Sequence, residues 1–109
     1  MASNIEQTLS FPASAAYTGE AINADTIGIV GLQCSAVSLS AADGTITLQH
    51  SNDGTIWGTV AAATTVASNA TGYYVPATVA PYKYYRVVWA KGANAAGTVT
   101  TKLMGKAAK

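Results

Sequence analysis

The sequence contains few of the residues that carry catalytic or metal chemistry. Only 10% of its 109 residues are charged, and it has one cysteine, Cys34, and one histidine, His50. A single cysteine cannot form a disulfide within the chain, which excludes the class of small secreted domains held by disulfides. Six basic against five acidic residues give a net charge of +1, without the basic field of a nucleic-acid-binding domain. We therefore expect no nucleic-acid partner.

Long apolar runs and targeting segments are also missing. No apolar run reaches the roughly 18 residues that a transmembrane helix needs. The first six residues, Met-Ala-Ser-Asn-Ile-Glu, contain neither a basic region nor a hydrophobic stretch. We therefore expect no membrane partner and no secretion signal, and hence synthesis in the cytoplasm.

The sequence shows no constellation of catalytic residues. An active site needs a nucleophile with a base, paired carboxylates or clustered metal ligands. His50 ends a predicted strand and is interpreted as a residue at a hairpin edge, and Cys34 is interpreted as a small buried hydrophobe. Asp43 and Asp53 each precede a glycine, which is typical of turns. The sequence thus predicts no enzyme, with no catalytic residues, no cofactor and no metal.

Strand patterns dominate what is present. Half of the residues are apolar, and alanine, threonine, glycine and serine together make up about half of the chain. Alternation of apolar and polar residues indicates half-buried strands. It is clearest at residues 5–11, 45–50, 82–90 and 98–104, and weaker at 17–22, 26–39, 56–60 and 73–75. Asp53-Gly54 is a strong hairpin signal between two of these segments.

These patterns predict an all-β fold in one domain over residues 1–109. About seven to nine short strands with turns roughly every 8–12 residues are typical of a single-domain antiparallel β-sandwich or jelly-roll-like barrel. Jelly-roll and immunoglobulin-like topologies both remain open. Residues 1–17 are expected to form an N-terminal arm, residues 61–71 a strand end and loop, and residues 105–109 a frayed tail.

The aromatic residues are the strongest candidates for a binding surface. Trp57 and Trp89 are expected in the core, because sandwich cores often hold a central tryptophan. Outward tyrosines beside Lys83 and Arg86 would serve either cross-strand pairing or an interface. The candidate interface residues are Tyr82, Tyr84, Arg86, Tyr73 and Tyr74, with Ile5, Leu9 and Phe11 of the N-terminal segment.

Charge and side-chain size bear on assembly. All five acidic residues lie within the first 53 positions, and all six basic residues lie from position 83 onward. This order would favour head-to-tail docking of copies, unless antiparallel strands interleave the charges. Burial of apolar surface stabilises a fold by about 25 cal/mol per Å², and the small alanine side chain buries little of it. We therefore expect self-assembly to add stability.

Three segments in the second half of the chain form a recognisable series. Ile46–Trp57 contains a Leu-Gln-x-Ser-x-Asp-Gly-x-x-Trp hairpin, Tyr84–Trp89 a Tyr-Arg-Val strand, and Ala96–Leu103 a closing Gly-Thr-Val strand. This series resembles small β-rich virion proteins of tailed bacteriophages. The resemblance extends over residues 45–104 of this chain.

The resemblance implies a capsid decoration (cement) protein on the virion surface. Such a protein would bind the major capsid protein on the outside of a phage head and stabilise the shell. Copies would associate as a homotrimer at three-fold positions, with the N-terminal arm lying on a neighbour or on the shell. Two alternatives stay open: a phage tail or head-fibre component, and a carbohydrate- or receptor-binding β-sandwich module.

Overall fold

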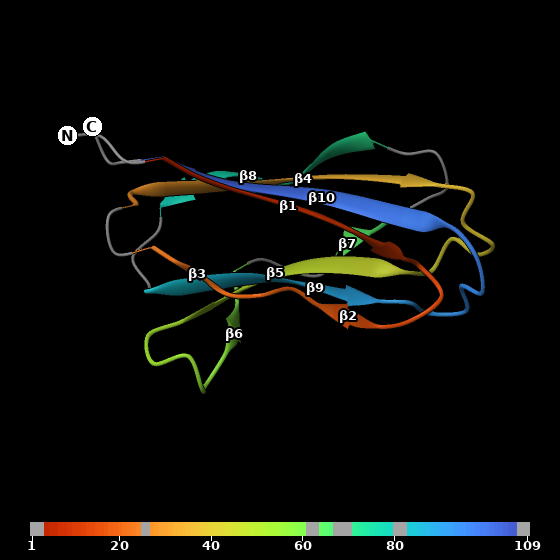
Figure 1. Ribbon diagram of the computed structural model, residues 1–109, viewed down its shortest axis with the longest axis horizontal. Coiled ribbons are helices and arrows are strands. Elements are labelled where there is room, and N and C mark those ends of the chain that lie inside the picture. Colours follow the sequence, from red (N-terminus) through yellow and green to blue (C-terminus); the bar gives the residue numbers. More distant parts are fainter. Residues whose placement is uncertain (1–3, 25–26, 61–63, 67–70, 80–82, 107–109) are drawn as a thin grey trace.

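The computed structural model describes residues 4–24, 27–60, 64–66, 71–79 and 83–106, with the backbone alone for Asn4 and for 71–79. Ten strands form two sheets that face each other (Figure 1). Among the described residues, no helix has the length and apolar character needed to span a membrane. The strands are β1 Asn4–Pro12, β2 Tyr17–Thr18, β3 Ile22–Asn23, β4 Ile29–Val37, β5 Thr45–Ser51, β6 Gly58–Thr59, β7 Thr64–Thr65, β8 Thr71–Val79, β9 Tyr84–Ala90 and β10 Thr98–Lys106.

The strand order is that of a jelly roll. The first sheet has the order β1-β10-β4-β8, and the second has the order β2-β9-β5-β6, with β3 on β9 and β7 on β5. The pairings are antiparallel. Taking β2 with β3 and β6 with β7 as interrupted single strands gives two four-stranded sheets, between which the chain crosses at nearly every connection. The all-β antiparallel prediction is confirmed, and four two-residue strands raise the count to ten.

Inward-facing side chains of the long strands fill the space between the sheets. Leu32, Leu48, Val87 and Leu103 are fully buried on the inner faces, while their neighbours in sequence turn outward. Side chains from the two inner faces of a sandwich interdigitate to form its core. Trp89 is the largest buried side chain, which confirms its predicted place.

The N-terminal segment is a strand of the domain, so the predicted arm is wrong where the structure describes it. Residues 4–12 form β1, which pairs with β10 along its whole length. Phe11 is buried, with its ring stacked on Tyr17 at 4.3 Å, and is therefore not the interface residue that we predicted. Ile5 and Leu9 are half-buried against the core. The same alternation that predicts the strand turns these side chains inward.

The C-terminal and middle segments also differ from expectation. Gly105 and Lys106 belong to β10, because β1 pairs with them, whereas 107–109 lie outside the described residues. Of the predicted loop over 61–71, residues 61–63 and 67–70 also lie outside the described residues. Strand β8 runs through Pro76, where a strand end was expected. An edge strand tolerates proline at a position whose N–H would point away from the sheet, because the missing N–H has no hydrogen bond to make there.

One acidic and one basic residue from opposite halves of the sequence meet in the first sheet. The Glu6 carboxylate of β1 lies 3.0 Å from the Lys102 ammonium of β10, and both side chains are about half exposed. Antiparallel pairing of the first and last strands thus joins the acidic and basic halves of the sequence. An exposed pair of this kind contributes little stability, at most about 1 kcal/mol.

Cys34 is predicted to be unreactive in the folded protein. It lies on the inner face of β4, and its burial raises the pKa of the thiol to about 11. Because the thiolate is the nucleophile, the folded protein should resist thiol-specific alkylation at mildly alkaline pH. Labelling followed by mass spectrometry, with and without denaturant, measures this. Rapid labelling of the folded protein would contradict the buried position.

Candidate functional site

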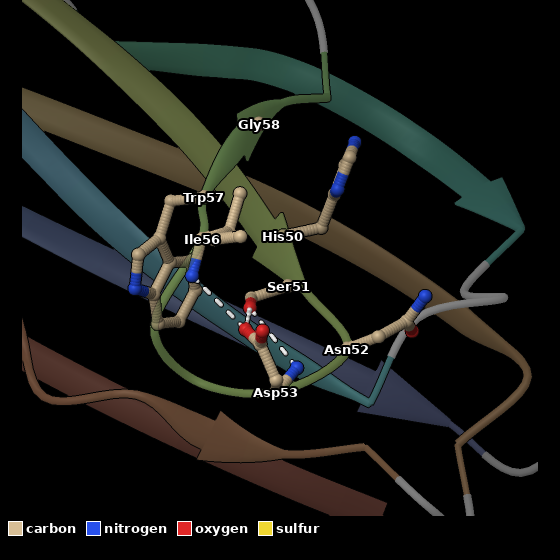
Figure 2. Close-up of a pocket in the computed structure, with 7 residues that line it drawn as sticks. All are labelled: His50, Ser51, Asn52, Asp53, Ile56, Trp57 and Gly58. Carbon is tan, nitrogen blue, oxygen red and sulfur yellow. Dashed lines mark hydrogen bonds between the residues drawn. The ribbon is translucent and has the colours of Figure 1, made fainter.

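The loop between β5 and β6 is held in one shape by its own side chains. Ser51 is buried, and its hydroxyl accepts hydrogen bonds from the backbone N–H of Asp53 at 3.2 Å and of Gly54 at 2.9 Å. The same hydroxyl donates to Asp53 Oδ1 at 3.0 Å. Asp53 Oδ1 also accepts from the N–H groups of Thr55 at 2.8 Å and Ile56 at 2.9 Å. Figure 2 shows the carboxylate turned into this loop.

These hydrogen bonds predict a pH-dependent loop. The N–H groups of Ile56 and Thr55, with the Ser51 hydroxyl, lower the pKa of Asp53 below its ordinary value of 3.8. The ionised carboxylate therefore supports the loop above that ordinary value, and the support is lost as the pH falls through the lowered pKa. Amide chemical shifts of Thr55 and Ile56 should titrate with a midpoint below 3.8. In Asp53→Asn the shifts should be flat over this range, and a midpoint at or above the ordinary value would contradict the arrangement.

Trp57 lies on the outer face of the second sheet, not in the core as predicted. The return strand begins at Gly58, so Trp57 belongs to the loop and escapes the alternation of the strands. The Arg86 guanidinium lies 4.0 Å from the centre of the Trp57 ring. Arg86 Nε also donates to Gln49 Oε1 at 2.8 Å, and these two residues are partners in the β5–β9 register. The side chains of Gln49, Arg86 and Trp57 therefore form one fixed stack.

Two further side chains lie on the same side of the sheet as this stack. Ile56, next to Trp57 in the loop, is 76% exposed. Tyr84 lies on the same outer face as Arg86, half-buried, and Lys83 Nζ is 5.5 Å from the centre of its ring. We call the outer-face set the Trp57 surface; its members are Gln49, Ile56, Trp57, Tyr84 and Arg86. Aromatic residues and arginine are the types most enriched at the energetic centres of protein interfaces.

A shallow pocket of about 320 Å³ lies beside the Trp57 surface. Figure 2 shows its lining residues, which are His50, Ser51, Asn52, Asp53, Ile56, Trp57 and Gly58. Ile56 and Trp57 provide apolar surface, while Asn52 and Asp53 provide polar groups at the rim. The His50 ring lies edge-on to Tyr85, with centroids 6.4 Å apart. Within the described ranges, no three histidine, cysteine or acidic side chains lie close enough together to hold a metal ion.

The structure brings together only some of the predicted interface residues. Tyr84 and Arg86 share the Trp57 surface. Tyr73 and Tyr74 lie in β8 of the first sheet, and Tyr82 lies outside the described residues. Ile5, Leu9 and Phe11 also belong to the first sheet.

Sequence reasoning missed the contributions of Gln49, Ile56 and Trp57 to a surface. The pairing of Gln49 with Arg86 could have been predicted, because both residues lie at outward positions of strands that the alternation indicates clearly. No alternation predicts the direction of side chains in a six-residue loop.

Fold and surface together define a jelly-roll module with an aromatic and cationic cluster on the outer face of its second sheet. Residues 1–104 match the family described as "Uncharacterised protein YqxG N-terminal domain", and the chain belongs to that family. No curated protein matches the chain.

Solved structures with a similar fold include one chain of the Bacillus endospore appendages, which are disulfide-linked pili. Its TM-score is 0.48 at 13% identity, over 98% of this chain and 89% of that one. A chain of the T13 particle of infectious bursal disease virus gives 0.46 at 14% identity, over 94% of this chain and 31% of that one. A chain of the Gt strain of the same virus gives 0.44 at 12% identity, over 97% and 36%. This chain thus spans about a third of the viral chains.

Proposed function

We propose that this protein is a virion structural protein that decorates the outer surface of a phage head and binds the major capsid protein through the Trp57 surface. The observation that carries the proposal is the Trp57 ring, held on Arg86 beside the exposed Ile56. The source of the phage assignment is the sequence resemblance to β-rich virion proteins over residues 45–104.

The motif that carries this resemblance is also what builds the surface. Gln49 of the motif holds Arg86, Ser51 and Asp53 fix the loop, and Trp57 ends it on the Arg86 guanidinium. Gly54 adopts a φ of 77°, which favours glycine, and a Cβ at this position would lie 3.7 Å from the Tyr84 ring. The motif therefore specifies an outward binding surface rather than a part of the core.

The physical properties of this surface suit attachment to a symmetric shell. Its Gln49, Arg86 and Trp57 side chains hold one another before binding, so they lose little conformational entropy when a partner docks. The exposed Ile56 adds apolar area beside a tryptophan and an arginine. When several copies are joined, weak contacts by each copy would multiply into firm attachment to the repeated subunits of the shell.

Binding to phage heads that lack their decoration protein tests the proposal. We expect saturable co-sedimentation of the purified chain, and Trp57→Ala should weaken it about thirtyfold, or ~2 kcal/mol. Ile56→Ala should weaken it about tenfold without disturbing the fold, because this side chain is mostly in solvent. The matched control is Val37→Ala, another exposed aliphatic residue, which lies on the outer face of the first sheet.

The outcomes separate the competing functions. Failure to bind heads would overturn the decoration role, and binding to isolated tails instead would support a tail component. Binding that Ile56→Ala and Trp57→Ala leave unchanged would remove the Trp57 surface from the proposal.

A glycan-binding module is the second candidate, and the pocket beside Trp57 favours it. The pocket is lined by the Trp57 ring together with the Asn52 amide and the Asp53 carboxylate, a combination that can bind a sugar ring and its hydroxyls. A glycan array with the wild-type chain and Trp57→Ala distinguishes this function. Glycan binding that the variant loses, together with no binding to heads, would favour the module over the decoration protein.

A further inference from the structure

The four edges of the two sheets are not equally protected against pairing with another strand. Natural proteins block sheet edges with very short strands, bulges, proline and charge. Both edges of the second sheet consist of two-residue strands, and β8 of the first sheet carries register shifts and Pro76. Strand β1 instead pairs with β10 over nine consecutive residues without a shift. It is the long, regular and unprotected edge in the part of the chain that the structure describes.

Charge and side chains on β1 also permit a close neighbour. Its one ionisable side chain is Glu6, which is already paired with Lys102 at 3.0 Å. Proline occurs only at its last position, Pro12. Thr8 and Ser10 are small, exposed and directed to the outer face. An edge strand of this kind presents a row of backbone N–H and C=O groups that a second strand can satisfy.

We propose that β1 of one copy pairs antiparallel with β1 of a second copy about a two-fold axis at Thr8, which makes the first sheet continuous across a dimer. Because side chains alternate between faces, inward residues must pair with inward residues. An axis at Thr8 meets this condition, keeps all nine residues in the ladder and sets Glu6 opposite Ser10. An axis at Glu6 would instead bring two carboxylates together, which cross-strand pairs avoid.

This symmetry gives the dimer a defined shape. A two-fold axis perpendicular to the sheet keeps both second sheets on the same side, so both Trp57 surfaces would face the same direction. The contact is isologous and closed, and therefore stops at two copies. The inference uses the first sheet alone and does not depend on the proposed attachment through the second.

Charge placed at the axis tests the pairing in the whole chain. By sedimentation velocity, the wild type should have the mass of a dimer. Thr8→Lys should halve that mass, because two ammonium groups would lie directly opposite each other. Thr100→Lys is the matched control and should remain dimeric. Like Thr8, Thr100 lies beside Lys102 on the outer face of the first sheet. Unlike Thr8, it belongs to β10, which is paired with a strand on each side.

A mixing experiment makes the test specific to this axis. Thr8→Glu alone should be monomeric, and an equimolar mixture of Thr8→Lys and Thr8→Glu should recover the dimer as a heterodimer, detected by native mass spectrometry. A monomeric wild type, a trimer that Thr8→Lys leaves intact, or a mixture that stays monomeric would overturn the proposal. Ile56→Ala should remain dimeric, so loss of head binding and loss of pairing are distinguishable.

Discussion

Trp89→Ala is expected to remove about 3–5 kcal/mol from the free energy of unfolding, a large part of the roughly 5–15 kcal/mol that stabilises a domain of this kind. The Trp89 side chain is 1% exposed, between the two sheets. Its indole Nε1 donates to the backbone carbonyl of Ala13 at 3.2 Å, and its ring lies 6.3 Å from that of Phe11. Alanine would leave a cavity and a buried carbonyl without its donor.

Urea denaturation followed by circular dichroism measures this loss. Trp57→Ala is the matched control, because it removes the other tryptophan from the outer face. That variant should lose less, about 1–2 kcal/mol, because it removes a half-buried cation–π stack on the outer face and leaves no cavity between the sheets. If Trp89→Ala unfolded at nearly the same urea concentration as the control, the central position of Trp89 would be wrong.

Gly44→Ala is the second large effect, expected to cost about 1–3 kcal/mol by overpacking. A Cβ at this position would overlap the Trp89 ring and lie 2.9 Å from Asn94 Nδ2. Asn94 cannot easily move, because it is buried and bonded at both ends of its amide. Its Oδ1 accepts from Ala41 N at 3.0 Å, and its Nδ2 donates to Lys91 O at 2.8 Å.

A double-mutant cycle ties this cost to the ring. Trp89→Phe removes the end of the indole that Gly44→Ala would strike, so the alanine should cost less in that background than in the wild type. Trp57→Phe provides the control background, in which the cost of Gly44→Ala should be unchanged. Equal costs in the three backgrounds, measured by urea denaturation, would show that Trp89 is not the obstacle.

The alternation within strands was enough to predict most of the long elements. The predicted segments 5–11, 45–50, 82–90 and 98–104 each follow the period of two. The structure has strands over 5–11, 45–50, 84–90 and 98–104, so the third begins later than predicted, and residue 82 lies outside the described residues. The reason is that one side of each strand faces the core, so apolar residues occur at every second position.

The candidate site depended on features that such a pattern does not carry. Trp57 follows a turn. Alternation fixes the direction of side chains only within a strand, so the pattern of β5 does not predict the direction of a side chain at the end of a six-residue loop. Likewise, a proline ends a strand only where the ladder needs a backbone N–H at that position, which proline lacks. Pro76 lies in the edge strand β8, where an outward-directed position has no such need. Which strand lies at an edge is a property of the whole sheet order, and local sequence does not encode it.

The pairing of the first strand with the last has a mechanical consequence. Asn4 lies opposite Lys106 in the β1–β10 ladder, so both described ends of the chain lie at the same end of the molecule (Figure 1). Tension applied to the two ends would load the backbone hydrogen bonds one pair at a time, because these bonds run perpendicular to the strands. The ladder would open like a zipper at low force. A particle that held this protein by its ends would therefore gain little strength from it.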